Sequence, residues 1–238
     1  MRSTFPEHSL ERCDIVRFVT PDQFQQAVLG RAKTEALAIS PELTRALESY
    51  YRLLLHWNGR MNLTALSLEP LMDTAIDRLF VEPLLTARVV PETPLRWLDL
   101  GSGGGSPAIP LKLVRPAAVL TMVESRGRKA AFLREAVRTL GLVGADVRNC
   151  RFEELCDDQR IAGNVELVTV RAVRPDQALF DCARAVLVDG GQMLVFGPQD
   201  ESSPVPAGFE LTQTVALARS SVVVLRRVFH VEQRPVTS

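Results

Sequence analysis

A glycine-rich run at residues 101–107 carries more chemical information than any other part of the chain. It follows the apolar stretch Trp97-Leu98-Asp99-Leu100 and reads Gly101-Ser102-Gly103-Gly104-Gly105-Ser106-Pro107. Glycines at 101, 103 and 105 permit positive φ and leave no Cβ between the backbone and a ligand. The next apolar run ends in Glu124, whose carboxylate can accept hydrogen bonds from both hydroxyls of a ribose. This combination predicts a site for a cofactor that contains a nucleoside.

The spacing of the glycines favours one cofactor class. A dinucleotide fingerprint, G-x-G-x-x-G/A, would place a small apolar residue at position 106. Here that position is Ser106, and Pro107 follows at once. Pyrophosphate needs a helix N-terminus held tightly against it, whereas S-adenosylmethionine carries no phosphate and needs an open turn for its carboxylate and ribose. The run therefore favours S-adenosylmethionine, and a dehydrogenase that uses NAD is kept as an alternative.

The composition excludes several classes of protein. The 238 residues include 28 Lys plus Arg and 28 Asp plus Glu, so no global field attracts the chain to nucleic acid, and any RNA contact must use a local basic patch. No apolar run reaches the ~18 residues that a membrane span needs, and no signal peptide is recognisable. We expect a cytosolic protein without a membrane partner.

The cysteines do not suggest a metal site or a nucleophile. Reducing conditions favour free thiols at Cys13, Cys150, Cys156 and Cys182. The spacing of Cys150 and Cys156 is poor for zinc, and no histidine lies nearby. We therefore expect no metal.

The first 90 residues are predicted to be a helical region that precedes a sheet-containing domain at 91–238. Residues 1–20 show weak signals for order. Helices are expected over 24–39, over 41–57 after the cap Ser40, and over 70–87, where Pro83 should bend or break the helix.

From residue 95 the pattern alternates between strand and helix, which predicts an α/β fold with a mostly parallel sheet. Strands are expected at 96–100, 119–123, 146–149, 167–171 and 191–196. Helices are expected at 107–114, 126–140 and 175–187. Two extended runs, 209–217 and 222–229, predict an antiparallel C-terminal hairpin at one edge of the sheet.

Ligands of an open α/β sheet bind beyond the carboxyl ends of its strands. Phe152 and Glu153 follow the third predicted strand, where an aromatic ring and a carboxylate would face the adenine. Arg171 follows the fourth strand, where its guanidinium can bind a carboxylate. The alternatives are that Phe152 packs a helix, that Glu153 favours a helix N-terminus, and that Arg171 forms a surface ion pair.

The sequence resembles the bacterial small-subunit (16S) ribosomal RNA guanine-N7 methyltransferases, the glucose-inhibited division protein B family. The residues that carry the resemblance are Leu98 to Leu111, Glu124 to Lys129, Phe132-Leu133-Arg134, Trp57-Asn58, Met61 to Thr64, Arg151 to Leu155 and Arg171-Ala172. It implies a class I, Rossmann-like methyltransferase fold and binding of S-adenosylmethionine. The cofactor-binding candidates are Gly101, Gly103, Ser106, Glu124, Phe152, Glu153 and Arg171. Arg171 is also the candidate catalytic residue.

The chemistry of that family is compatible with what the chain lacks. Guanine N7 has a free lone pair and no proton to lose, so methyl transfer needs positioning and no general base. No Asn-Pro-Pro-Tyr-like motif for amino-group methylation follows the fourth strand.

An RNA partner would need basic residues, and they are densest at Arg126, Arg128, Lys129, Arg134 and Arg138. The alternative is a solvated helix face of mixed charge. Tyr50, Tyr51 and Trp57 could stack on bases, but their helical spacing favours core packing. The expected partner is ribosomal RNA or the small ribosomal subunit, and a monomer is favoured.

The chain also departs from the family pattern. The family commonly has a His and an Asp-Ser pair where this chain has Thr74 to Phe80, and a Lys-Gly where it has Phe196-Gly197. The usual bulky residue of the glycine turn is Ser106 here, and the usual Asp is Glu124. Two further alternatives follow. One is a divergent methyltransferase with a different acceptor, and the other is a non-catalytic RNA- or ribosome-binding module that keeps a vestigial cofactor pocket.

Overall fold

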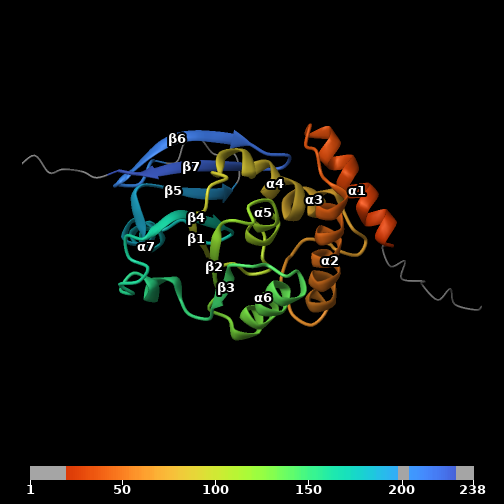
Figure 1. The fold of residues 1–238 in the computed structure, drawn as a ribbon, viewed down its shortest axis with the longest axis horizontal. Helices are drawn as coiled ribbons and strands as arrows, with labels where there is room; N and C mark the ends of the chain where they lie inside the picture. Colours follow the sequence, from red (N-terminus) through yellow and green to blue (C-terminus); the bar gives the residue numbers. More distant parts are fainter. Residues whose placement is uncertain (1–19, 198–203, 229–238) are drawn as a thin grey trace, which may run out of the picture.

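A seven-stranded sheet with helices on both faces forms the centre of the computed structural model, which describes residues 20–197 and 204–228 (Figure 1). The strands are β1 (Arg96–Leu100), β2 (Val119–Val123), β3 (Ala145–Arg148), β4 (Val165–Arg171), β5 (Leu187–Gly197), β6 (Phe209–Ala216) and β7 (Ser221–Arg227). Their order is β3-β2-β1-β4-β5-β7-β6, in which β1 to β5 are parallel and β7 is antiparallel to both of its neighbours, β5 and β6. The expected mostly parallel sheet with a C-terminal hairpin is confirmed. Residue 229, the predicted end of the hairpin, lies outside the described residues.

The direction of strand order reverses between β1 and β4, so the carboxyl ends of these neighbours define the position where an open α/β sheet binds its ligand. Leu100 of β1 pairs with Val123 of β2 and with Val170 of β4. The residues that follow these three strands therefore meet at one edge.

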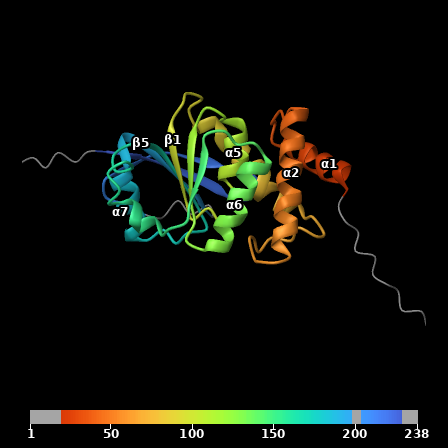
Figure 2. The same cartoon turned by 60° about the horizontal axis from the view of Figure 1, so that its bottom comes forward.

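The helices form two unequal layers. Helix α7 (Gln177–Val186) covers one face, while α5 (Ala108–Val114) and α6 (Gly127–Thr139) cover the other (Figure 2). Helix α2 (Pro41–Asn58) packs outside α5 and α6, and its neighbour is α1 (Pro21–Thr34). Core residues on both sides of the predicted boundary at residue 90 belong to one apolar cluster. No helix in the described parts of the chain is long and apolar enough to cross a bilayer.

The predicted helix over 24–39 is wrong at its C-terminal end, because α1 ends at Thr34. Ala36 adopts a left-handed φ of 51°, and the Leu37 N–H donates to the carbonyl of Ala32 over 2.8 Å. This six-to-one bond is the terminating bond of a Schellman motif. Alanine gives little sequence signal for that conformation, which explains the error. Residues 1–19, expected to be weakly ordered, lie outside the described residues.

The helix predicted over 70–87 forms from residue 73 as consecutive segments of different type. They are α3 (Asp73–Ile76), the π-helical η1 (Asp77–Val81), α4 (Glu82–Thr86) and the 3₁₀ turn η2 (Ala87–Val89). Pro83 lies in the first turn of α4, where a missing N–H is tolerated. A further 3₁₀ turn, η3 (Phe152–Leu155), follows β3.

Two glycine-to-alanine substitutions should affect the stability of this fold in opposite directions. Gly30 lies exposed in α1 with nothing within 4 Å of an added Cβ. Gly191 lies in β5, where a Cβ would lie 2.9 Å from the Val188 carbonyl oxygen and 3.3 Å from that of Val165. Gly30→Ala should raise the free energy of unfolding by about 0.5–1 kcal/mol, and Gly191→Ala should lower it by about 1–3 kcal/mol. Urea unfolding of both variants measures the difference, and equal effects would contradict this packing.

Candidate cofactor site

The glycine turn lies at the carboxyl end of β1, is hydrogen-bonded to β2 and lies against the segment that follows β4. Gly101, Gly103 and Gly105 have φ values of 74°, 52° and 88°. The N–H groups of Gly101 and Ser102 donate to the Val123 carbonyl of β2 over 2.9 and 3.0 Å. A Cβ at Gly101 would lie 2.4 Å from Val173, which follows β4. Glycine is thus required at 101 by backbone conformation and by space.

Glu124 directly follows β2 and binds the turn. Its Oε2 accepts from the Gly103 N–H over 2.9 Å, and its Oε1 accepts from the Arg126 N–H over 2.8 Å. The Asn149 amide donates to the Glu124 carbonyl over 2.8 Å, which ties this segment to the end of β3. Each carboxylate oxygen keeps a second lone pair. The structure therefore joins two predicted site residues, Gly103 and Glu124, and orients the carboxylate.

Arg171 and Ser106 form a second pair of predicted site residues that the fold brings together. Arg171 Nη1 lies 3.4 Å from Ser106 Oγ and also donates to the Arg78 carbonyl, while Nη2 donates to Glu82 over 3.1 Å. Its guanidinium carbon lies 4.3 Å from the centre of the Phe196 ring. Because the side chain is only 9% exposed, the surface ion pair considered as an alternative is wrong. Burial lowers the pKa of Arg171 to about 10, against the opposing charge of Glu82.

Phe152 and Glu153 lie in η3 and contact a different part of the molecule. The Phe152 ring packs on the core beneath α7, and its carbonyl accepts from the Cys182 thiol over 3.3 Å. Glu153 pairs with Arg151 over 3.1 Å, and this ion pair lowers the pKa of the carboxyl. Neither side chain has a hydrogen bond to the glycine turn among the described residues.

Asp99, in β1, is a buried carboxylate with incomplete hydrogen bonding. Its Oδ1 accepts from the Thr169 hydroxyl over 2.6 Å, and that hydroxyl accepts from the Trp97 indole over 2.8 Å. Asp99 Oδ2 and Arg171 Nε have no partner among the described residues. Burial raises the pKa of Asp99 to about 6, although hydrogen bonds and the charge of Arg171 oppose the shift. Buried polar atoms are normally satisfied, so these two atoms indicate a place for polar groups of a ligand or for water.

Several polar residues near the site are absent from the sequence-based candidates. Asp77 and Glu82 are fully buried, and both contact Arg219 in the turn between β6 and β7. The sequence did contain a signal for them: two acids within the largely apolar stretch 75–85 indicate buried carboxylates that need cationic or hydrogen-bonding partners. Their partners lie too far away in sequence to be identified from the pattern.

Two tyrosines of α2 donate hydrogen bonds to backbone carbonyls, and the carbonyl that accepts from Tyr50 lies in the glycine turn. The Tyr50 hydroxyl donates to the Gly104 carbonyl over 2.6 Å, and the Tyr51 hydroxyl donates to the Leu68 carbonyl over 2.9 Å. Burial raises the pKa of both tyrosines, that of Tyr51 to about 12. Their predicted role as core residues is confirmed.

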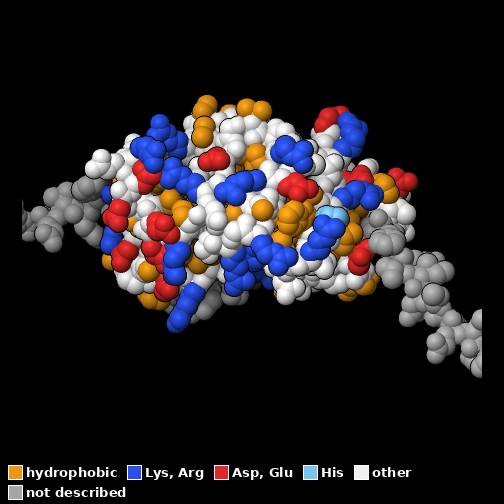
Figure 3. Space-filling view, turned by 90° about the horizontal axis from the view of Figure 1, so that it is seen from below, with side chains coloured by type: hydrophobic (Ala, Val, Ile, Leu, Met, Phe, Trp, Pro, Cys, Tyr) orange, Lys and Arg blue, Asp and Glu red, His pale blue; other side chains and the backbone are white. Residues whose placement is uncertain are grey.

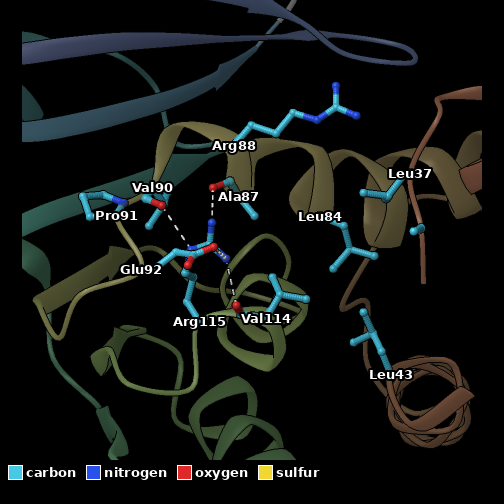
Figure 4. Close-up of a pocket in the computed structure, with 11 residues that line it drawn as sticks. Leu37, Leu43, Leu84, Ala87, Arg88, Val90, Pro91, Glu92, Val114 and Arg115 are labelled. Atoms are coloured by element: carbon cyan, nitrogen blue, oxygen red, sulfur yellow. Dashed lines mark hydrogen bonds and ion pairs between the residues drawn. The ribbon is translucent and has the colours of Figure 1, made fainter. Parts of the chain in front are cut away.

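A cavity of about 480 Å³ lies away from this site (Figure 4). Leu37, Leu43, Leu84 and Val114 form its apolar wall, and the Arg115 guanidinium donates to the carbonyls of Val90, Val114 and Ala87. None of the predicted site residues lines this cavity.

In the part of the chain that the structure describes, the acidic side chains and thiols form no cluster suited to a metal ion. Within residues 20–197 and 204–228, no three His, Cys, Asp or Glu side chains are grouped so as to hold a metal ion. Cys150, Cys156 and Cys182 are free thiols, and burial raises the pKa of Cys150 and Cys182. Cys13 lies outside the described residues.

Solved structures with a similar fold include a SAM dependent methyltransferase from Aquifex aeolicus. It has a TM-score of 0.50 and 14% identity, covering 63% of this chain and 91% of that one. P. horikoshii TYW2 in complex with MeSAdo has a TM-score of 0.50 and 16% identity, covering 61% of each chain. At these identities the likeness concerns the fold alone.

Relatives in sequence are closer. Ribosomal RNA small subunit methyltransferase G of Halorhodospira halophila is 33% identical over 201 residues, which cover 80% of this chain and 91% of the relative. The protein of the same name from Stenotrophomonas maltophilia (strain R551-3) is 35% identical over 184 residues, covering 76% and 81%. The profile of the family GidB, described as rRNA small subunit methyltransferase G, matches residues 43–228. The chain therefore belongs to the rRNA small subunit methyltransferase G family.

Proposed function

We propose that this protein transfers a methyl group from S-adenosylmethionine to N7 of a guanine in small-subunit (16S) ribosomal RNA. The observation that carries the proposal is the geometry of Glu124, whose carboxylate is fixed by the Gly103 and Arg126 N–H groups beside a turn of left-handed glycines. Family membership supports the substrate. A cytosolic location and a monomeric state stay predictions.

The residues at the edge of the sheet fit this cofactor in three respects. The free lone pairs of Glu124 suit the two ribose hydroxyls. The unpartnered Asp99 Oδ2 and Arg171 Nε suit the ammonium and carboxylate of the methionine end. The glycines at 101 and 103 leave the backbone of the turn open on the ligand side. We assign the adenine end to Phe152 and Glu153 from their place after β3.

The cofactor supplies an electrophilic methyl on a sulfonium, and the attacking guanine N7 loses no proton. Transfer would break the S–CH₃ bond as the N–CH₃ bond forms, and the sulfur would keep the electron pair, so no residue of this chain has to accept a proton. The protein's task is therefore to align the donor and the acceptor and to exclude alternative geometries. Arg171, held beside Ser106, is the candidate catalytic residue because its cation lies at this edge.

RNA is assigned to the exposed face of α6. Arg126, Arg128, Arg134 and Arg138 are exposed, and none forms an ion pair with a carboxylate of the described chain. Figure 3 shows Lys and Arg side chains gathered across the middle of the face that includes this helix. The acid within the cluster, Glu135, accepts from the Trp57 indole over 3.2 Å. Unopposed cations next to the segment that follows Glu124 suit an RNA backbone.

A substitution pair tests the proposed function. Glu124→Gln should weaken binding of S-adenosylhomocysteine at least tenfold and lower methyl transfer, because a carboxylamide cannot accept at both positions. Glu166→Gln is the matched control, since Glu166 accepts from the Arg96 N–H over 2.7 Å in β4, away from the site. Calorimetry measures binding, and labelled cofactor with small subunits that lack the modification measures transfer.

Three outcomes would each contradict part of this proposal. Failure of the unsubstituted protein to bind the ligand would exclude the cofactor. Binding without methyl transfer would favour the RNA-binding module, and label in a different acceptor would favour a divergent methyltransferase. Titration with NAD tests the dehydrogenase alternative, which predicts that the protein binds NAD.

Binding of the cofactor should release protons near pH 6. The raised pKa of Asp99 means that the free protein takes up a proton as the pH falls through about 6. An ammonium bound at Oδ2 requires the ionised form, so binding expels that proton and affinity falls below pH 6. Calorimetry at pH 6 in two buffers of different ionisation enthalpy should detect the release, and Asp99→Asn should abolish it. Equal proton release by the two proteins would show that Asp99 does not bind the ammonium of the cofactor.

Neutralising the α6 face should weaken RNA binding without affecting cofactor binding. Arg126→Gln, Arg128→Gln and Arg134→Gln combined should reduce the slope of log affinity against log salt by about 0.7 per lost phosphate contact. Arg45→Gln, on α2 and already paired with Glu42, is the control. Filter binding of 16S RNA across a salt series measures the slope, and an unchanged slope would exclude this face.

A further inference from the structure

The π turn η1 brings two acids onto the same face of its helix. In a regular α-helix, residues five apart point about 140° away from each other. Here the Glu82 N–H donates to the Asp77 carbonyl, the i to i+5 bond of a π-helix. Both carboxylates can therefore reach Arg219, whose Nε donates to Asp77 over 2.9 Å and whose backbone N–H donates to Glu82 over 2.9 Å.

The π turn and Pro83 leave two backbone carbonyls without their usual i+4 donors. The Glu82 N–H bonds to Asp77 and so does not take the carbonyl of Arg78. Pro83 has no N–H to give to the carbonyl of Leu79. The freed carbonyl of Arg78 accepts from Arg171 Nη1, and that of Leu79 accepts from the Ser106 hydroxyl over 3.0 Å. The helix thus offers acceptors to both residues of the Arg171–Ser106 pair.

The two acids hold different cations. Asp77 accepts from Arg31 Nε and Nη2 over 2.7 and 2.9 Å, so it binds the outer helix α1. Glu82 accepts from Arg171 Nη2 over 3.1 Å and from the Ser220 hydroxyl over 2.8 Å. Of the two, the one that contacts Arg171 is Glu82.

We propose that Glu82, together with the carbonyls exposed by the π turn and Pro83, is a positioning element that fixes Arg171 at the cofactor edge. The proposal rests on the proposed function, because it assumes that Arg171 contributes to the cofactor site. Glu82 affects cofactor binding by holding Arg171 in place, and not by stabilising the fold as a whole. Asp77, equally buried on the same helix face, supplies the internal comparison.

The charge environment of Arg171 gives a readout that a purely structural role would not change. Four charged or titratable groups face it from four elements: Glu82 on α4, Arg78 on η1, Asp99 on β1 and Tyr50 on α2. Burial holds the pKa of Arg171 at about 10, and Glu82 is the largest opposing influence. Removing the charge of Glu82 should lower that pKa further, so we expect the cation to be lost at a less alkaline pH.

The experiment compares Glu82→Gln with Asp77→Asn in the full chain, with S-adenosylhomocysteine as the probe in calorimetry from pH 7 to 9.5. Glu82→Gln should weaken binding at least tenfold at pH 7.5 and weaken it further toward pH 9.5. The unsubstituted protein and Asp77→Asn should agree within threefold at every pH, because titration of the ligand's own ammonium affects both proteins alike. Equal losses and parallel pH profiles for the two variants would reduce Glu82 to a structural role and overturn the proposal.

Two further variants keep the test decisive. If Glu82→Gln does not fold, Glu82→Asp retains the charge but shortens the reach. It should weaken binding with a pH profile like that of the unsubstituted protein, and unchanged affinity would overturn the proposal. Arg171→Gln distinguishes a failure of the cofactor-site assignment of Arg171 from a failure of the positioning role of Glu82. If it leaves affinity unchanged, Arg171 is not part of the cofactor site and the positioning role is lost with it. If it weakens binding while the Glu82 variants do not, only the positioning role fails.

Discussion

The burial of two carboxylates on one turn of helix is the constraint on which the packing of distant segments around that helix depends. Asp77 and Glu82 have no access to solvent, and an ionised carboxylate in that position must be paired and hydrogen-bonded. Their partners come from α1, the end of β4 and the turn between β6 and β7. Removing one partner of such a group costs about 3–5 kcal/mol. Segments distant in sequence are thereby held in one geometry.

Such a cluster is weak support for overall stability, because desolvation offsets much of the attraction between the charges. Its more important effect is specific placement. Apolar packing would tolerate small shifts of a helix against a sheet edge, whereas hydrogen bonds to two freed carbonyls and a carboxylate do not. The parallel sheet brings the ends of β1, β2 and β4 together. The helical segments from 73 to 86 then accept hydrogen bonds from Arg171 and Ser106 at that edge.

Much of this molecule could be predicted from local pattern. The strands at 96–100 and 119–123 are short apolar runs, and the structure places both there. The glycine turn and Glu124 were recognisable because their chemistry lies in contiguous residues and a fixed spacing. Termination of α1 was missed because a left-handed alanine has no sequence signature.

The buried ion pairs could not be predicted for a different reason. Asp77 and Arg219 are separated by 142 positions, and only the folded topology brings them together. The π turn was equally hidden, since Pro83 alone indicates a disturbance of the helix but not its form. Arg171 was predicted to lie at the ligand edge, but its burial and its partners follow from that same helix.

The ion pair between Arg31 and Asp77 matters for any chain shortened at its N-terminus, because it links α1 to a buried carboxylate. Helix α1 looks peripheral, since it lies at one end of the molecule and packs mainly against α2, α3 and η1 (Figure 1). Yet its Arg31 supplies a bidentate partner to a carboxylate that is 0% exposed. A chain cut after α1 would leave Asp77 with Arg219, a cation whose side chain is 43% exposed, as its remaining charged partner in the described structure. A chain that begins after Arg31 would therefore lose one of the two cations that pair with this buried carboxylate, although Arg31 lies well ahead of the first strand.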